Sequence, residues 1–438
     1  MRSPGRTAAL LGLLFGLAGT GTSAATVVLP ELASELGVGP STAAWTISVY
    51  AVMLAVATPL HGRLADAYGL RGPLVVGLSA MVGGSVVAAL APTFPVLLAG
   101  RVVQGFGGAS VPVLATALIS TLWSGPQRSS ALGRLAGIAA AFSALGPLLG
   151  GALEEIGGWR LAIAVPALGV VSLPWLARRA PAGGTGERID RVGALFVAAT
   201  AAGLVLLLQS PSSGPVTAMI GAVMLAVGVP AVAIWVRRRP TGFLPRVVVT
   251  NPVVLRSAFA TAAIPAAWFA LLIGVPLTAA EWGWSPFEIG LLLLPAVAVG
   301  IVAPWLSRTA LGRLGPRRTI VTGVGIAVVA MLTGAAGAAL DSPVLLAFAV
   351  LALNTAFGIG QPAMISAVDG AVDAAERGIA LGIASLVFLV GASIGAALVG
   401  GLAEVTGIAV ALCVLVALPV MGLTVLLLGP RQRTPVRV

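Results

Sequence analysis

Charge is scarce in this sequence of 438 residues. Charged residues make up only 9% of the chain, lysine is absent, and hydrophobic residues reach 58%. Soluble proteins carry about 25% charged residues, so this chain has too few charges to cover a surface that faces water. The composition excludes a soluble enzyme, a secreted domain and a disordered tail. It predicts a polytopic membrane protein.

Cysteine and histidine are also nearly absent. Cys413 is the one cysteine and His61 is the one histidine. A single cysteine allows no intrachain disulfide and no Cys-based metal cluster. A single histidine removes His-cluster metal sites, and it leaves little for the usual serine–histidine catalytic pairing. We therefore expect no enzymatic activity, no metal and no cofactor.

The net charge of +11 comes from arginine alone. A surplus of this size indicates either nucleic acid or an anionic membrane surface as the partner. Apolar runs separate the arginines, and no basic stripe with interleaved aromatic residues is present. The pattern favours the lipid bilayer, and we expect no nucleic-acid partner.

Long apolar runs predict transmembrane helices. The hydrocarbon core is about 30 Å thick, so a crossing helix needs about 20 mostly apolar residues. The runs are continuously apolar, whereas the strands of a membrane barrel alternate apolar and polar residues. Fourteen ranges meet the requirement: 8–30, 42–61, 73–92, 95–121, 132–153, 159–177, 192–209, 215–236, 253–278, 286–306, 319–340, 343–366, 378–402 and 406–428.

The positions of the arginines test this count. Lys and Arg concentrate in the cytoplasmic loops of membrane proteins. With the N-terminus inside, all arginines except Arg101 and Arg160 fall on the predicted cytoplasmic side. One helix more or fewer would move every later loop to the opposite side of the membrane. We therefore predict fourteen spans with both termini cytoplasmic. The first apolar run continues to Pro30, and we interpret it as a helix rather than as a cleaved signal peptide.

A weak internal repeat divides the chain. A shift of 245 residues places residues 132–153 over 377–398, and a shift of 246 places Gly69 over Gly315. The shift pairs the first six predicted helices with the last six and leaves a hairpin between them. We predict an N-terminal six-helix bundle over 1–180, a cytoplasmic linker with an inserted transmembrane hairpin over 181–250, a C-terminal six-helix bundle over 251–430 and a cytoplasmic tail over 431–438.

Two repeated bundles favour a transport function. Bundles related by an axis along the membrane normal are the plan of many secondary transporters, with the substrate site between them near mid-membrane. A receptor or scaffold that transports nothing is the alternative from another class.

The loop after the second predicted helix reads GRLADAYGLR over residues 62–71. Gly62 and Gly69 allow a tight turn. Asp66, together with the base Arg71, can latch the ends of two bundles, above all if the carboxylate faces a helix N-terminus.

Two further segments lie inside predicted helices. Residues 101–108 read RVVQGFGG, and a buried Arg101 normally faces protein or a water-filled cavity because a mid-membrane charge is costly. Gln104 lies one turn away on nearly the same face. Residues 146–151 read GPLLGG, where Pro147 kinks the helix and Gly146, Gly150 and Gly151 let another helix approach closely.

These three segments resemble signature motifs of the Major Facilitator Superfamily, and 146–151 resembles the motif of its antiporters. With fourteen spans, the chain resembles the fourteen-helix drug:proton antiporter family over nearly its whole length. The resemblance implies two bundles that alternate access to a central site, in the plasma membrane. It also implies multidrug-type efflux of small, often amphipathic compounds, driven by protons moving inward.

One departure from that family concerns acidic residues. Relatives that export cationic drugs often carry an acid in the first helix, whereas no carboxylate lies at the centre of any predicted span here. Neutral, zwitterionic or anionic substrates therefore fit better than dications. The candidates for proton coupling are Arg101, Gln104, Glu31, His61 and Glu155, with Asp66 and Glu404 as further acids near helix ends.

Polar or aromatic residues within apolar spans are the candidates for a substrate cavity: Thr26, Tyr50, Gln104, Trp268, Asn354 and Gln361. We expect a small-molecule substrate and protons as partners, and a monomeric protein. A facilitative uniporter, an importer and a lipid transporter are the alternatives within transport.

Overall fold

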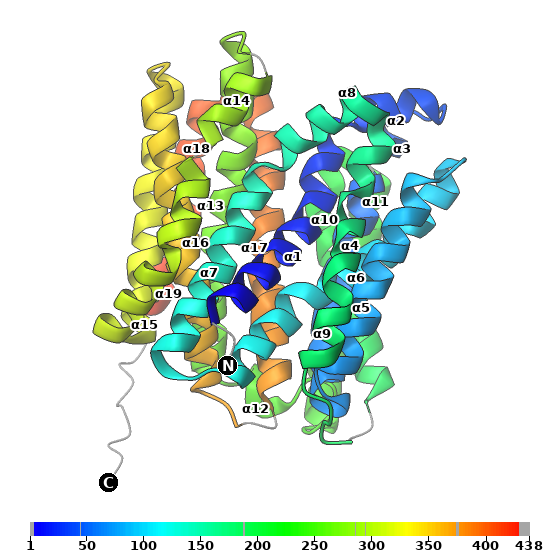
Figure 1. Cartoon of the computed structure of the whole chain (residues 1–438), viewed down its shortest axis with the longest axis vertical. Coiled ribbons are helices and arrows are strands. Elements are labelled where there is room, and N and C mark those ends of the chain that lie inside the picture. The colour runs from blue at the N-terminus through cyan, green and yellow to red at the C-terminus, as the bar shows by residue number, and fades with distance from the viewer. Residues whose placement is uncertain are drawn as a thin grey trace.

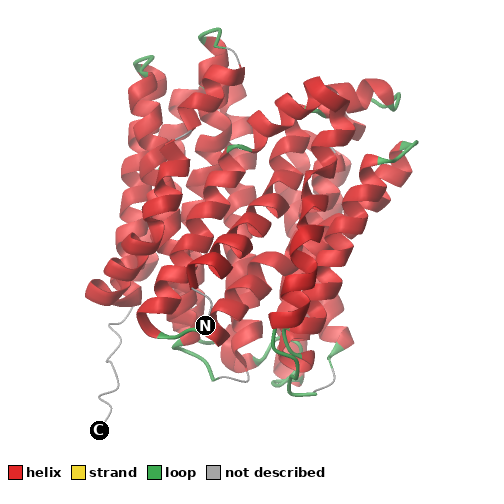
Figure 2. Cartoon of the chain, in the orientation of Figure 1, coloured by secondary structure: helices red, strands yellow, loops and turns green. Residues whose placement is uncertain are grey.

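The computed structural model of the chain describes residues 4–43, 45–186, 189–284, 286–293, 295–373 and 376–428. Most of these residues are helical and none belongs to a strand, although one isolated backbone bridge joins Gly69 and Ala182. Figure 2 shows the helices lying alongside one another, with the loops gathered at two ends. The predicted all-helical architecture is confirmed.

The helices fall into three groups along the chain. The N-terminal group comprises α1 (Pro4–Val27), α2 (Leu29–Glu35), α3 (Pro40–Ala43), α4 (Trp45–Tyr68), α5 (Arg71–Ala89), α6 (Phe94–Leu122), α7 (Gly125–Ala144), α8 (Gly146–Ala164), the 3-10 helix η1 (Val165–Ser172) and α9 (Leu173–Arg179). The middle group comprises α10 (Arg191–Ser213), α11 (Pro215–Arg238) and α12 (Arg246–Val249). The C-terminal group comprises α13 (Pro252–Glu281), α14 (Pro286–Leu293), α15 (Pro295–Ala339), α16 (Pro343–Asp369), α17 (Arg377–Thr406), α18 (Ile408–Leu415) and α19 (Ala417–Leu427).

Ten helices of the described residues are long and apolar enough to cross a membrane. Two shorter apolar helices, Arg191–Leu207 and Arg377–Ala392, add to them. All fourteen predicted ranges overlap described helices. The prediction of a multi-span membrane protein is therefore confirmed, while the count of fourteen crossings stays a prediction.

Glycine and proline explain where helix boundaries differ from the predicted ranges. Gly158 (φ 68°) and Gly315 (φ 75°) adopt left-handed backbone conformations that favour glycine, and they break α8 and α15 internally. The range predicted as one helix over 132–153 is divided between α7 and α8 just before Pro147. A proline cannot donate the backbone hydrogen bond that would continue a regular helix.

The N- and C-terminal groups meet through two sets of helices. α4 packs against α17, and α7 packs against α15 and α16. Figure 1 shows α9 and α12 at one end of the molecule and α2, α3 and α14 at the other. We call the first the Arg-rich end, because Arg71, Arg128, Arg179 and Arg246 lie at the helix ends and loops there. The positive-inside rule predicts that this end is cytoplasmic.

α10 lies against both groups at once. Ala201 and Val205 of α10 pack with Val52 and Val56 of α4 and with Leu386 of α17. Its hairpin partner α11 packs against α10. Only 11% of the most apolar 18-residue stretch of α11 is buried, against 83% for the corresponding stretch of α6. A helix so apolar and so exposed fits a position against lipid.

Asp190 closes the base of this hairpin. Its carboxylate accepts hydrogen bonds from the backbone N–H of Gly193 (3.0 Å), the indole of Trp235 (2.7 Å) and the N–H of Phe243 (3.2 Å). Burial alone would raise the pKa of Asp190, but these donors outweigh it and lower that pKa. A lowered pKa means that this stabilisation is complete above about pH 4 and is lost only as the pH falls through the lowered value.

Candidate functional site

Arg101 occupies the interior of the N-terminal group. The side chain on α6 is fully buried. Its Nε donates to the carbonyl oxygen of Thr46 on α4 (2.9 Å), and one terminal nitrogen donates to that of Gly21 on α1 (2.6 Å). The other terminal nitrogen donates to Oε1 of Gln104 (2.6 Å). The guanidinium thereby joins three helices.

Tyr50 completes the surroundings of this guanidinium. The Arg101 guanidinium carbon lies 4.4 Å from the centre of the Tyr50 ring, and the Tyr50 hydroxyl donates to the carbonyl oxygen of Ala18 (2.6 Å). Gly105 makes this approach possible, because a Cβ there would lie 2.7 Å from the Tyr50 carbonyl oxygen. The structure thus brings together Arg101, a coupling candidate, Tyr50, a cavity candidate, and Gln104, which belongs to both sets.

The charge of Arg101 is balanced by dipoles. Among the described residues, its partners are carbonyl oxygens, an amide and a ring, and no carboxylate pairs with it. A buried cation without an acidic partner is costly, so it commonly marks a functional position in a membrane protein. Such a group attracts negative charge.

Gln104 extends the network towards α5. Its Nε2 donates to the Ser85 hydroxyl (2.8 Å) and to the carbonyl oxygen of Ile163 (3.4 Å). The sequence analysis did not select Ser85. A serine in an apolar span gives no distinct signal, because most such hydroxyls only bond to their own helix, and Ser85 also donates to Met81 in this way (2.7 Å).

The other proton-coupling candidates lie apart from Arg101. His61 is buried, bonds to the carbonyl oxygen of Ala57 (2.9 Å) and packs against Phe106. It follows Tyr50 by eleven residues on α4, or about 16 Å along the helix. Glu155 is exposed on α8, and the side chain of Glu404 lies outside the described residues.

Glu31 belongs to a polar network at the end opposite the Arg-rich end. Its carboxylate accepts the backbone N–H of Trp159 (2.8 Å), beside the left-handed Gly158. The neighbouring Glu35, which the sequence analysis did not select, pairs with Arg160 and accepts the Trp159 indole N–H (2.6 Å). The Arg160 guanidinium and then the Trp159 indole lower the pKa of Glu35. These contacts tie α2 to α8.

Asp66 joins the two groups at the Arg-rich end. Its two carboxylate oxygens accept the backbone N–H groups of Gly378 (3.0 Å) and Ile379 (2.9 Å) in the first turn of α17. A carboxylate is favoured there because the first helical N–H groups lack internal partners and carry partial positive charge. Gly62 lies inside α4 and not in the predicted turn. It lets the helices approach, since a Cβ at this position would lie 2.7 Å from the Gly378 carbonyl oxygen.

The end of α4 that carries Asp66 is itself covered by the following linker. Gly69 has φ 80°, and a Cβ there would lie 2.6 Å from the Gly183 carbonyl oxygen. The backbone N–H of Arg71 donates to Pro181 (3.1 Å), while its side chain is exposed. The N–H of Thr185 donates to the Asp66 carbonyl oxygen (2.9 Å).

Asp369 forms a second connection that the sequence analysis missed. This acid ends α16 and makes ion pairs with Arg128 at the start of α7 and with Arg377 at the start of α17. The Ser307 hydroxyl on α15 also donates to the carbonyl oxygen of Ser129 on α7 (3.1 Å). The pair from position 128 to position 369 has no spacing signal in the sequence. The Arg-rich ends of the two groups are therefore held together by several polar contacts.

The segment 146–151 contacts α1. A Cβ on Gly150 would lie 2.9 Å from the Ala24 carbonyl oxygen, and one on Gly146 would overlap the Ser23 side chain. Gly151 has more room, because a Cβ there would lie 3.9 Å from Val27. The side chain of Pro147 lies outside the described residues. This close approach lies within the N-terminal group.

The remaining cavity candidates lie in the C-terminal group. Asn354 and Gln361 are buried on α16, seven residues or about 10 Å apart along the helix, and Trp268 is buried on α13, which packs against α16. Asn354 Nδ2 donates to the Ala296 carbonyl oxygen. Asn354 Oδ1, Gln361 Oε1 and Trp268 Nε1 have no hydrogen-bond partner among the described residues. The side chain of Thr26 lies outside them.

Comparison with known proteins identifies the family. The sequence pattern of the Major Facilitator Superfamily matches residues 11–375 and 257–438. Apolar spans around buried polar residues, together with this match, define a multi-pass membrane transporter. The chain belongs to the Major Facilitator Superfamily, as its three motifs predicted.

Two relatives illustrate the similarity. The chain is 31% identical over 320 residues to the multidrug resistance protein Stp of Mycobacterium tuberculosis, a match that covers 70% of this chain and 58% of that protein. It is 28% identical over 419 residues to the uncharacterized transporter YebQ of Escherichia coli, covering 90% of this chain and 89% of that protein.

A solved structure shows the same fold. The crystal structure of the human organic anion transporter MFSD10 (TETRAN) matches with a TM-score of 0.65 and covers 97% of this chain and 100% of that chain. The sequences are 16% identical, so this likeness concerns the fold.

Proposed function

We propose that the protein exports small hydrophobic or amphipathic compounds, such as drugs or metabolites, in exchange for protons. The observation that carries this proposal is the fully buried Arg101, bonded to Gly21, Thr46 and Gln104 on neighbouring helices. A buried cation held by dipoles responds strongly to any charge that enters or leaves the interior. Because Arg101 on α6 bonds to carbonyl oxygens of α1 and α4, a change of charge near it would alter the contacts between these helices. The name of the relative Stp supports the export of drugs.

Alternating access supplies the proposed mechanism. The bundles of residues 1–180 and 251–430 would rock about a central site, with the inserted hairpin and linker between them. Asp66 at the start of α17 and Asp369 between Arg128 and Arg377 hold the Arg-rich end closed. Opening that end requires the bonds of Asp66 and the pair of Asp369 with Arg128 to break, so these contacts set the balance between two states of the transporter.

The buried residues favour certain substrates. Arg101 offers positive charge, and the candidate residues Tyr50, Trp268, Asn354 and Gln361 offer aromatic surface and hydrogen-bonding groups. A cation would find no buried anion at the centre of a predicted span. We therefore propose neutral, zwitterionic or anionic amphipaths as substrates, in a monomer of the plasma membrane with both termini cytoplasmic. Fusing a reporter to each terminus would test that orientation.

A pH gradient separates antiport from facilitated diffusion. In proteoliposomes loaded with anionic, zwitterionic and cationic fluorescent dyes, antiport moves dye against its own gradient only while a pH gradient exists. For one dye molecule exchanged per proton, with the membrane potential held at zero, one pH unit supports about a tenfold dye gradient.

Collapse of the pH gradient with a proton–potassium exchanger should abolish this accumulation. Dye movement that persists down its own gradient would identify a uniporter or an importer, and movement of a fluorescent phospholipid would identify a lipid transporter. If no compound in the panel shows counterflow, a sensor or scaffold is favoured. Liposomes without protein are the control.

The close packing of α8 on α1 gives a prediction for the segment 146–151. Gly150→Val places a branched side chain against the Ala24 backbone, because the added Cβ alone would lie 2.9 Å from the Ala24 carbonyl oxygen. Overpacking of this kind costs about 1–3 kcal/mol. We expect dye efflux to fall at least about fivefold, measured at equal amounts of protein in the membrane. Gly151→Val, whose Cβ meets only Val27 at 3.9 Å, is the matched control. Equal loss in both variants would contradict a specific role of the Gly150 contact.

A further inference from the structure

A cavity of about 240 Å³ lies at the Arg-rich end, where the two groups of helices meet. The start of α1 and the first turns of α7 form one side of it, and Arg308 of α15 forms the other. Drug-sized ligands occupy pockets of about 300–1,000 Å³, so the cavity suits a smaller group. It is also separate from the buried residues around Arg101.

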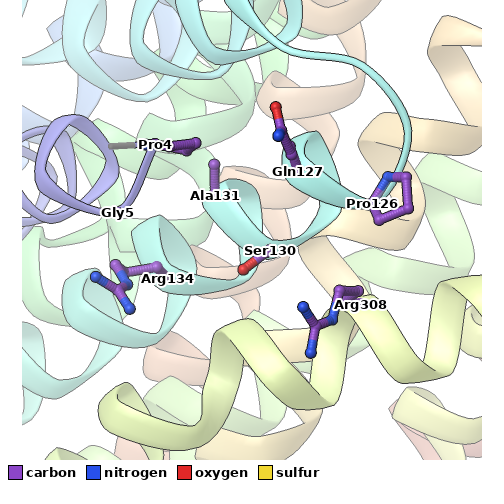
Figure 3. A pocket seen from close by; sticks show the side chains of 8 residues that line it. All are labelled: Pro4, Gly5, Pro126, Gln127, Ser130, Ala131, Arg134 and Arg308. Carbon is purple, nitrogen blue, oxygen red and sulfur yellow. The ribbon is translucent and has the colours of Figure 1, made fainter. Parts of the chain in front are cut away.

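Two arginines from different groups border this cavity. Figure 3 shows the guanidinium groups of Arg134 and Arg308 on either side of Ser130. None of its eight lining residues is acidic. In the described part of the chain, neither arginine forms an ion pair, whereas the nearby Arg128 is paired with Asp369. Two positive charges that border the same cavity repel each other. An anion between them would be attracted to both and would offset this repulsion.

The backbone adds to this electrostatic preference. Gln127 lies in the first turn of α7, a helix of 20 residues, and lines the cavity, as does its neighbour Pro126, which has no backbone N–H. The N–H groups of a first helical turn carry partial positive charge and favour anions. The hydroxyl of Ser130 and the amide of Gln127 supply further donors. Gly5 lets Arg134 lie against α1, since a Cβ there would lie 2.5 Å from a guanidinium nitrogen.

We propose that this cavity binds a phosphate-type anion, held between Arg134 and Arg308 so that it joins the N-terminal group to the C-terminal group. Guanidinium groups present paired donors that match phosphate oxygens. The headgroup of an anionic phospholipid and free inorganic phosphate share this chemistry. The proposal concerns a site apart from the transported compound and does not depend on the identity of that compound.

The experiment uses the full chain in nanodiscs of phosphatidylcholine, with and without phosphatidylglycerol. Native mass spectrometry counts the phosphatidylglycerol molecules that stay bound, and a titration of inorganic phosphate in phosphatidylcholine nanodiscs follows the unfolding temperature. The variants are Arg134→Gln, Arg308→Gln and their double variant. Ser130→Leu fills the cavity without changing its charge. Arg318→Gln removes an exposed arginine from the same end as a control.

We expect each of the two cavity arginine variants to weaken anion binding about fivefold, because a basic residue near an anionic surface contributes about 1 kcal/mol. The double variant and Ser130→Leu should abolish the specific signal, while Arg318→Gln should leave it unchanged. A site-dependent response to phosphatidylglycerol alone identifies a lipid headgroup, and one to inorganic phosphate identifies a soluble anion. No response to either anion, or equal loss in Arg318→Gln, would overturn the proposal. Circular dichroism checks that each variant is folded, and binding is read independently of transport.

Discussion

Arg101→Ala is expected to abolish energised efflux while leaving a folded protein in the membrane. The substitution removes three hydrogen bonds from a charged group, to Thr46, Gly21 and Gln104. Each such bond contributes about 1.5–3 kcal/mol. We expect dye efflux driven by a pH gradient to fall at least about a hundredfold. The measurement compares initial rates at equal amounts of reconstituted protein.

Two further variants distinguish charge from geometry at this position. Arg101→Lys keeps the positive charge but replaces the planar fork by a compact ammonium. It should therefore retain part of the efflux. Arg318→Ala, which removes an exposed arginine on α15, should transport normally. Full transport by Arg101→Ala would contradict the role that we propose for the buried guanidinium.

Asp66→Asn is expected to slow the transport cycle by loosening the Arg-rich end. Asparagine can still accept one N–H from the first turn of α17, but it loses the charge that both Gly378 and Ile379 contact. A charge at a helix end contributes about 0.3–1 kcal/mol and up to about 2 kcal/mol in favourable geometry. A loss of about 1 kcal/mol shifts the balance between closed and open states about fivefold.

Distances between spin labels measure this shift directly. Labels at exposed Gly72 and Arg313, after replacement of the exposed Cys413, report the separation of the two groups at this end. The Asp66→Asn distribution should move to longer distances. Asp369→Asn should act in the same direction because it leaves Arg128 and Arg377 without their carboxylate. Asp373→Asn, which changes an exposed acid between α16 and α17, is the matched control. Unchanged distances and turnover in Asp66→Asn would refute the latch.

Local patterns were enough to predict the helices and the family motifs. A run of apolar residues long enough to cross the bilayer indicates a helix whatever its neighbours are. Every predicted range accordingly overlaps a described helix. Helix breaks were less predictable. Gly157 and Gly158 interrupt α8 and Gly315 interrupts α15, yet in a chain with 57 glycines most glycines leave the helix intact.

The site was predicted in part, because its members differ in how much signal they carry. Arg101 stands out as a charge inside an apolar run, and Gln104 follows one turn later. Thr46 contributes only a backbone carbonyl oxygen to Arg101, so its side chain carries no information about that contact. In the sequence, Asp369 looks like any acid at the end of a helix, because its partner Arg128 is distant along the chain and comes close only in the folded structure.

The sequence alone determined that the chain lies in a bilayer, which segments are helical, and which single basic residue sits deep in an apolar helix. These properties depend on local composition and on the cost of placing charge in hydrocarbon. Only the tertiary structure decided which groups balance Arg101, that Asp66 meets the start of α17, and that Arg134 and Arg308 share a cavity. Such contacts join residues from well-separated helices. Their geometry follows from how small residues let those helices approach, and no spacing rule along the chain encodes it.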